Sequence, residues 1–350
     1  MRYRDFRSDT VTQPTAAMRQ AMFDAVVGDD ILGEDPTVQE LERLSAELMG
    51  KEAALFVISG SMANQIAIMT LTERGDEVIV GQDSHIYNLE AGGLAALSQV
   101  QVKALPGYRG EFRLEDIEQA VRKPGLQFPL SRVLCLENTH DLNRGMVLTP
   151  AYTRATAELA HRHGMKVYLD GARIFHAAEA LGVDLKELVE PVDAMMFCLS
   201  KGLAAPVGAM LLGTREFIDK ARWIRQRMGG GMRQAGHMAA AGIVALRDMR
   251  ERLGEDHKRA RRLAEGLAGI DPSLVDLTIV DSHTVRIELS ELGLKAEALA
   301  AKLLEYKIKV KAIGEYRCRM ICHIDTDDGD VDYALEAIRA IVAGHRATHK

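Results

Sequence analysis

Short apolar segments alternate with amphipathic segments from about residue 37 to about residue 250, and this alternation constrains the fold more than any other feature of the chain. The apolar segments are nearly continuous, as in strands that are buried on both faces. Helix signals separate them: residues 37–40 form a capping-box pattern after Pro36, and Thr149-Pro150 starts a helix that ends at Gly164. We therefore expect a mostly parallel sheet with helices on both faces, with strands at residues 53–58, 78–80, 133–136, 165–169, 194–199 and 209–212.

The pattern changes after about residue 250. A charged helix at residues 250–267 precedes two alternating segments at 275–279 and 285–289, a helix at 296–306, a strand at 319–324 and a last helix from 331. Such segments indicate an α+β region with antiparallel strands. The predicted organisation is an N-terminal arm at residues 1–20, a large α/β domain at 21–250 and a smaller C-terminal α+β domain at 251–350.

Composition excludes several classes of protein. The chain has 350 residues and a net charge of −6 without a basic stretch, which disfavours nucleic acid as a partner. No apolar run is long enough to span a membrane, and residues 1–7 lack the apolar core of a signal peptide. The four cysteines have no CxxC spacing and indicate reduced thiols in a cytoplasmic protein, although the pattern leaves a disulfide open.

Two charged residues follow apolar strands. Lys201 follows the strand at 194–199, and Asp170 directly follows the strand at 165–169. Ligands bind at the carboxyl edge of such sheets. A lysine there can form a Schiff base and an aspartate can hold a pyridinium nitrogen, which together are the minimum protein equipment for pyridoxal 5'-phosphate (PLP) chemistry. The alternative is a lysine in a strand-to-turn junction and an ordinary strand-end aspartate.

Other segments point to the same edge of the sheet. Residues 59–65 (Ser-Gly-Ser-Met-Ala-Asn-Gln) follow a strand and open a helix, so their backbone amides suit an anion. His85 follows the strand at 78–80, where it can stack on a flat cofactor or be a structural histidine. Arg173 suits a carboxylate or a phenolate. The glycine-rich turn at 229–234 suits phosphate, or is a flexible loop.

Together these motifs resemble the low-specificity L-threonine aldolases, PLP enzymes of fold type I in the aspartate aminotransferase superfamily. The resemblance covers nearly the whole chain and is densest from residue 7 to residue 245. The motifs, in this order and spacing, are residues 7–12, 28–30, 33–37, 59–65, His85, 136–140, 169–173, 199–202 and 229–236.

The resemblance implies a role for each matching cofactor residue. Lys201 would bind PLP covalently, Asp170 would pair with the pyridine nitrogen, and His85 would stack on the ring and is a candidate proton carrier. Arg173 lies near the cofactor, and Arg233 would reach the phosphate from a neighbouring subunit. The other phosphate-binding residues would be Gly60, Ser61 and Met62.

The resemblance also implies the substrate and the reaction. Ser8, Arg173 and Arg319 would bind the carboxylate of a small amino acid. The reaction would be retro-aldol cleavage of L-threonine and L-allo-threonine to glycine and acetaldehyde, in which a base removes the β-hydroxyl proton. The resemblance implies a homo-oligomer with shared sites, as a dimer or a tetramer. No metal ligand is assigned, and a bound monovalent or divalent cation stays open.

Three positions depart from the family pattern. Relatives often carry Tyr where this chain has Leu32, and His where it has Gln127, just before Phe128; the turn at 141–145 also deviates. These departures leave the aldehyde preference, the threo or erythro preference and the general base open.

A β-eliminating lyase or aminotransferase on the same scaffold is the first alternative function, because the cofactor residues do not fix which Cα bond breaks. A non-catalytic interaction protein of this fold is the second.

Overall fold

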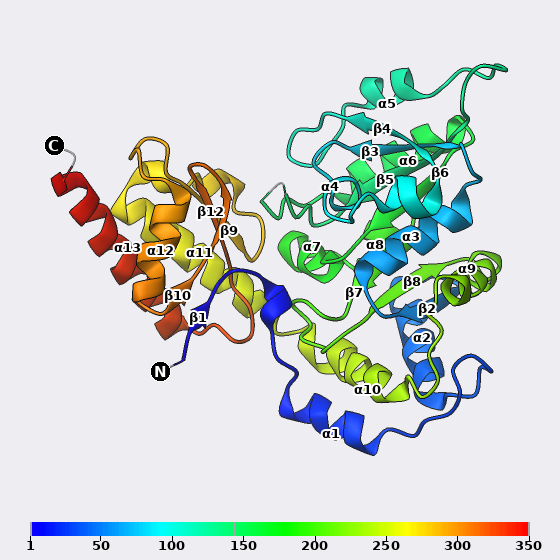
Figure 1. The fold of residues 1–350 in the computed structure, drawn as a ribbon, viewed down its shortest axis with the longest axis horizontal. Coiled ribbons are helices and arrows are strands. Elements are labelled where there is room, and N and C mark those ends of the chain that lie inside the picture. Colours follow the sequence, from blue (N-terminus) through cyan, green and yellow to red (C-terminus); the bar gives the residue numbers. More distant parts are fainter. Residues whose placement is uncertain (1, 143, 349–350) are drawn as a thin grey trace. The chain divides into compact units, whose positions relative to one another are not determined.

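A computed structural model describes residues 2–142 and 144–348 of the chain, so Asn143 in the deviating turn lies outside the described residues. The chain divides into two compact units. The large unit spans Pro14–Arg250, and the small unit combines the first 13 residues with those from Glu251 onward (Figure 1). Among the described residues, no helix is both long and apolar enough to cross a membrane.

A seven-stranded sheet forms the centre of the described large unit, and it is mostly parallel, which confirms the predicted fold class. Only β8 runs antiparallel to its neighbours, which are β2 and β7. In sheet order the strands are β2 (Ala53–Val57), β8 (Ala209–Gly213), β7 (Ala194–Cys198), β6 (Lys166–Asp170), β5 (Ser131–Glu137), β3 (Glu77–Gly81) and β4 (Gln101–Leu105).

Helices cover both faces of this sheet (Figure 1). Helices α3 and α9 share a buried apolar cluster with one face, to which Leu55, Val80 and Met196 contribute. Helices α2 and α6 pack on the other face, against β2 and β6. The helices of this unit are α1 (Ala16–Asp24), α2 (Pro36–Met49), α3 (Gly60–Leu71), α4 (His85–Asn88), α5 (Leu114–Ala120), α6 (Pro150–Arg162), α7 (Ile174–Leu181), α8 (Leu185–Val189), α9 (Arg215–Arg227) and α10 (Gly236–Val244), with π-helical turns at Leu94–Ser98 and Ala245–Met249.

The predicted capping box at residues 37–40 is wrong, because α2 begins at Pro36, before Thr37. Asp35 is the N-cap, and its Oδ1 accepts from the amides of Thr37 and Val38 at 3.1 and 3.0 Å. Its Oδ2 accepts from the amides of Gly28 and Gly236 at 3.2 and 2.8 Å. One buried carboxylate therefore caps α2 and holds two distant segments against it.

The small unit contains an antiparallel sheet, in the order β11 (Lys311–Gly314), β12 (Arg317–Ile321) and β9 (Thr284–Glu288). Strands β9 and β12 were predicted from the sequence, whereas β11 was not. Short strands β1 (Arg4–Asp5) and β10 (Ile308–Lys309) pair in parallel. The apolar cluster between this sheet and the helices includes Leu263, Val285, Leu299 and Ile338. The helices are α11 (Leu253–Ile270), α12 (Ala296–Glu305) and α13 (Asp328–Thr348), with a 3₁₀ turn at Asp9–Val11.

The strand predicted at residues 275–279 is wrong. Two 3₁₀ turns, Pro272–Leu274 and Leu277–Ile279, occupy this region. The side chains of Asp271 and Asp276 accept from the amides of Ser273 and Thr278 at 2.8 and 2.9 Å. These local hydrogen bonds compete with strand pairing for the same backbone donors.

Candidate active site

The carboxyl edge of the large sheet collects the polar residues that the sequence patterns single out. Asp170 ends β6, and Glu137, its register partner, ends β5. His85 begins α4, just beyond the end of β3, and Lys201 lies just beyond the end of β7. Because β3, β5, β6 and β7 are parallel neighbours, their carboxyl ends meet at one edge.

Asp170 is buried and its carboxylate is held on both oxygens. Oδ1 accepts from the amide of Ala172 at 3.1 Å, and Oδ2 accepts from Nδ2 of Asn64 at 2.9 Å. These bonds fix the direction of the carboxylate. A buried, oriented carboxylate suits the protonated nitrogen of an aromatic ring.

His85 lies beside a buried glutamate. Its Nδ1 is 3.0 Å from Oε1 of Glu90, and its backbone amide donates to Oε2 of Glu137 at 2.7 Å. The hydrogen bond to Glu90 raises the pKa of His85, burial opposes this, and the charge of Asp170 adds to the rise while that of Lys201 lowers the pKa. One ligand-type atom each of His85, Glu90 and Asp170 lies within 4.8 Å of the others. The structure therefore brings His85 and Asp170 together, as the sequence predicts.

Lys201 is half-buried, in the turn between β7 and β8. Its carbonyl accepts from the amide of Ala204 at 2.8 Å. A Cβ atom on Gly202 would lie 2.3 Å from Nε2 of His176, so only glycine fits next to the lysine without a shift of that ring. This close approach fixes the backbone at Lys201 relative to α7.

The turn into α3 has the geometry of an anion site. Ser59 is the N-cap, and its Oγ accepts from the amide of Met62 at 3.2 Å. Gly60 and Ser61 are the first two helical residues, whose amides have no acceptor within a helix. A Cβ on Gly60 would lie 2.7 Å from Cε of Met196, and one on Gly230 would lie 2.7 Å from Sδ of Met62. Gly60 therefore lets the turn lie close to the side chains of β7, and Gly230 lets its own backbone lie close to Met62.

Two arginines of the large unit were predicted as site residues, and their environments differ. Arg173 is buried, and its Nη1 donates to Oδ1 of Asp141 at 2.9 Å. The side chain of Arg233 is 61 % exposed and donates to Oδ2 of Asp29 at 2.7 Å. The roles of both residues toward substrate or phosphate stay predictions.

Ser8 and Arg319 belong to the small unit, where they lie near each other. Ser8 caps the first 3₁₀ turn by accepting from the amide of Thr10 at 3.2 Å. Arg319 is buried on β12, and its Nη2 donates to the carbonyl of Arg7, the residue before Ser8, at 3.4 Å. Their shared role in binding a substrate carboxylate stays a prediction.

Three polar residues near this edge were not singled out as site residues in the sequence: Asn64, Glu90 and Glu137. All three are buried, and burial raises the pKa of Glu137. Asn64 lies on α3 one turn beyond Gly60, within the segment predicted to bind phosphate. Glu90 follows His85 by five residues, but nothing in the sequence pattern distinguishes it from a surface glutamate.

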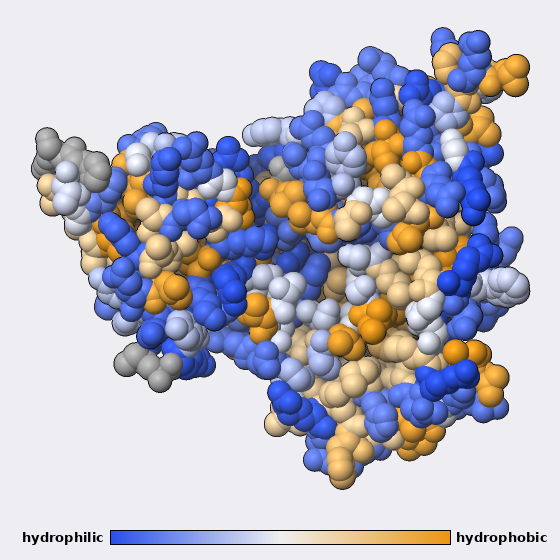
Figure 2. Space-filling view, viewed as in Figure 1, coloured by the Kyte–Doolittle hydropathy of each residue, from blue (hydrophilic) through white to orange (hydrophobic). Residues whose placement is uncertain are grey.

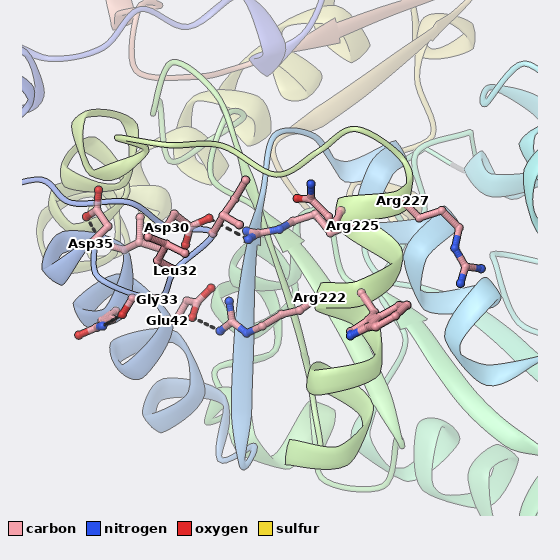
Figure 3. A pocket seen from close by; sticks show the side chains of 13 residues that line it. Asp30, Leu32, Gly33, Asp35, Glu42, Arg222, Arg225 and Arg227 are labelled. Atoms are coloured by element: carbon pink, nitrogen blue, oxygen red, sulfur yellow. Dashed lines mark hydrogen bonds and ion pairs between the residues drawn. The ribbon is translucent and has the colours of Figure 1, made fainter.

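The departing residue Leu32 lies elsewhere, beside a cavity of about 680 Å³. Figure 3 shows Arg222 and Arg225 of α9 extending toward the loop that carries Asp30 and Leu32, whereas Arg227 extends away from this loop. Arg225 and Asp30 form a buried ion pair of 2.8 Å. Leu32 is 67 % exposed and Gln127 is also exposed. Within this chain the cavity is not lined by Lys201, Asp170 or His85.

The residues at the sheet edge fit PLP. Lys201 supplies an amine, Asp170 an oriented carboxylate, His85 a flat ring, and the start of α3 a set of backbone amides for a phosphate. A solved threonine aldolase from Leishmania major has this fold, with a TM-score of 0.83 at 20 % identity, over 97 % of this chain and 99 % of that chain. A solved structure of SPT with PLP matches with a TM-score of 0.76 at 19 % identity, over 98 % of this chain and 88 % of that chain. The fold is that of a fold type I PLP enzyme.

Sequence comparison narrows this class. The family model for beta-eliminating lyases matches residues 5–290. The probable low-specificity L-threonine aldolase 2 of Arabidopsis thaliana is 43 % identical over 342 residues, which are 96 % of each chain. The low specificity L-threonine aldolase of Escherichia coli K12 is 45 % identical over 271 residues, 76 % of this chain and 80 % of that one. The chain therefore belongs to the beta-eliminating lyase family and, within it, to the group of low-specificity L-threonine aldolases.

Proposed function

We propose that the protein is a PLP-dependent lyase that cleaves L-threonine and L-allo-threonine to glycine and acetaldehyde, and other β-hydroxy-α-amino acids to glycine and the corresponding aldehyde. One observation supports this choice of reaction. The chain is 43 % identical to a relative named as a probable low-specificity L-threonine aldolase, and the aligned region covers 96 % of both chains. The matching family model carries the name of the beta-eliminating lyases, but the relatives from Arabidopsis thaliana and Escherichia coli are named threonine aldolases, which favours aldol cleavage. An aminotransferase and a non-catalytic protein have no comparable support.

In this proposal the residues of the sheet edge hold the cofactor. PLP, when bound, supplies an electron sink for the charge released at Cα. Lys201 holds it through Nζ, Asp170 keeps the ring nitrogen protonated, and Gly60, Ser61 and Met62 at the start of α3 bind the phosphate, with the amides of Gly60 and Ser61 as donors that have no acceptor within the helix. Support comes from the buried, doubly held carboxylate of Asp170 and from the close backbone approach at Gly60.

The substrate is held by its carboxylate and deprotonated at its β-hydroxyl group. Arg173 and Arg319, with Ser8, bind the carboxylate, which places the Cα–Cβ bond at the cofactor. Nε2 of His85 carries the β-hydroxyl proton and returns a proton to the product. Support comes from Glu90, whose hydrogen bond occupies the other ring nitrogen of His85 and raises its pKa toward the operating range of an acid–base catalyst.

An assay of products tests this function. Purified protein with PLP should release equimolar glycine and acetaldehyde from L-threonine and from L-allo-threonine. Ammonia with a keto acid would identify a β-eliminating lyase, and transfer of the amino group to an added keto acid would identify an aminotransferase. A protein that neither takes up PLP nor turns over any of these substrates would be the non-catalytic alternative.

We further propose a cytoplasmic homo-oligomer, built from dimers with shared sites that pair into a tetramer. Large apolar side chains are exposed on the large unit, including Phe23 at 82 %, Val26 at 69 % and Trp223 at 74 %. Figure 2 shows further hydrophobic surface over α10. Exposed apolar surface of this kind is typical of an interface. Light scattering on the purified protein measures the number of subunits.

A further inference from the structure

A hydrogen-bonded path connects His85 to Asp170 inside the large unit. Nδ1 of His85 lies 3.0 Å from Oε1 of Glu90, and that oxygen also accepts from Nδ2 of Asn64 at 2.6 Å. Nδ2 of Asn64 also donates to Oδ2 of Asp170 at 2.9 Å. The side chain of His85 is 27 % exposed, whereas that of Glu90 is 1 % exposed, and Asn64 and Asp170 are buried. The path therefore begins at an accessible ring and ends at a buried carboxylate.

The orientation of the Asn64 amide in this path is fixed. Its Oδ1 accepts from the hydroxyl of Tyr168 at 2.7 Å, while its two N–H groups donate to Glu90 and Asp170. A flipped amide would place its oxygen against two carboxylate oxygens, which are all acceptors. Asn64 therefore holds the two carboxylates at one spacing through separate N–H bonds.

Glu90 is held on both oxygens as well. Its Oε2 accepts from Nε2 of Gln65 at 2.9 Å, and Oε1 of Gln65 accepts from the hydroxyl of Ser98 at 3.0 Å. Because an ionised carboxylate only accepts, Nδ1 of His85 must carry a hydrogen in this contact. The neutral imidazole then has its free lone pair on Nε2, so Nε2 is the atom that gains and loses a proton.

We propose that Glu90 and Asn64 are positioning residues for the reaction: Glu90 fixes the tautomer of His85 so that Nε2 exchanges the proton, and Asn64 holds Glu90 beside Asp170. The step that uses this proton rests on the proposed function, whereas the tautomer of His85 is a property of the protein itself. Four charged groups face His85. Glu90 and Asp170 favour its protonated form, Lys201 disfavours it, and Glu137 accepts from its backbone amide.

NMR of the full-length protein with PLP bound, carrying ¹⁵N in its histidine rings, tests the role of Glu90. The signal of His85 is identified by its loss in His85→Gln. Wild type should show the Nδ1–H tautomer. Glu90→Gln should keep this tautomer, because an amide oxygen still accepts, but should titrate at lower pH, because the negative charge is gone. Glu90→Ala should lose the preference for Nδ1–H. The surface variant Glu158→Gln on α6 is the matched control and should titrate as wild type.

Kinetic measurements on the same variants show whether Glu90 positions His85 for the reaction or only stabilises the fold. In Glu90→Gln, kcat should fall by about tenfold or more, which is part of the 10²- to 10⁴-fold that acid–base catalysis contributes in full, while KM changes little. The lower arm of its pH–rate profile should shift in the same direction as the NMR titration. An unchanged titration and tautomer in both Glu90 variants would overturn the role of Glu90. Absence of threonine cleavage by wild type with the predicted tautomer present would overturn the proposed function alone.

Two variants test Asn64. Asn64→Leu removes both N–H bonds. Tyr168→Phe removes only the hydroxyl that orients the amide, and this variant tests the role of Asn64 if Asn64→Leu does not fold. Each should retain PLP, lower kcat and shift the pH at which the cofactor absorbance changes. In Asn64→Leu the reason is that Asp170 and Glu90 are no longer held together, and in Tyr168→Phe it is that the amide between them is no longer oriented. Wild-type kcat and an unshifted absorbance titration in the folded variants would overturn the role of Asn64.

Discussion

At the scale of single residues, the carboxylate of Asp170 gives the sharpest kinetic prediction. Its two oxygens accept from Ala172 and Asn64, so Asp170→Asn, which has nearly the same size, loses the charge and one of these two acceptors. The pyridine nitrogen would then no longer be held protonated. We expect PLP to stay bound and kcat to fall on the order of hundreds-fold or more, because the interaction strengthens as charge develops. Steady-state kinetics that leave kcat unchanged would contradict this role.

The covalent link to the cofactor is predicted at Lys201, next to the close approach of Gly202 and His176. Borohydride reduction of the protein with PLP should fix the cofactor irreversibly on this lysine, and Lys201→Ala should lose turnover. Peptide mapping by mass spectrometry locates the modified residue. Lys220, which donates to the carbonyl of Thr70 away from this edge, is the matched control, and Lys220→Ala should still be modified on Lys201. Label on any other lysine would refute the assignment.

Arg319 is predicted to act on the substrate rather than on the cofactor. A guanidinium binds a carboxylate through two parallel bonds, which an ammonium group cannot reproduce. Arg319→Lys should therefore raise KM for threonine while PLP occupancy, measured by absorbance, stays at the wild-type level. The reverse result, lost PLP with unchanged KM, would assign Arg319 to another part of the site.

Sequence reasoning reaches some of these residues and not others, for a physical reason. Lys201, Asp170 and His85 are predictable because each follows an apolar strand, and parallel strands bring their carboxyl ends together. Glu90 and Asn64 are not predictable in the same way. Their importance comes from hydrogen bonds across 26 to 106 residues of sequence, which no local pattern encodes.

At the scale of helices and strands, some elements were likewise predictable from the sequence and others were not. The central strands were predictable because they are short, apolar and buried, as in β7, where every residue is buried. The edge strand β4 was missed because Gln101 and Lys103 interrupt its apolar pattern where one side of the strand faces solvent. The start of α2 was misplaced because the pattern at residues 37–40 was given more weight than Pro36, which suits the first position of a helix capped by Asp35; the contacts of Asp35 with Gly28 and Gly236 favour the same start.

This cap gives a stability prediction. Asp35→Ala removes acceptors from the amides of Thr37 and Val38 and also from those of Gly28 and Gly236. We expect a loss of about 2 kcal/mol or more in the free energy of unfolding, since a cap contributes about 1 kcal/mol and unsatisfied buried amides add to the cost. Thr214→Ala, which removes an ordinary cap from α9, is the control and should cost about 1 kcal/mol. Urea unfolding measures both, and equal losses would show that the contacts beyond α2 contribute nothing.

At the scale of the whole molecule, the open question is whether one active site uses two chains. The structure brings the glycine-rich turn to the phosphate-binding turn within one chain, because Gly230 packs against Met62. The side chain of Arg233, however, is mostly exposed and pairs with Asp29. An exposed guanidinium beside exposed apolar surface is available to a second subunit. A two-fold dimer that presents Arg233 across its interface would create two equivalent shared sites.

Hybrid dimers show whether Arg233 acts in the active site of its own chain or in that of the second subunit. Lys201→Ala and Arg233→Ala are each expected to be nearly inactive, and the two variants are co-expressed with different tags so that the mixed dimer can be purified. If Arg233 acts across the interface, one site of the hybrid carries both lesions and the other carries none. The hybrid should then regain up to about half of the wild-type activity, since one of two symmetry-related sites is intact. If Arg233 acts within its own chain, every site carries one lesion and no activity returns. Arg227→Ala in place of Arg233→Ala is the matched control, because it also removes an exposed arginine and should leave the parent enzyme active.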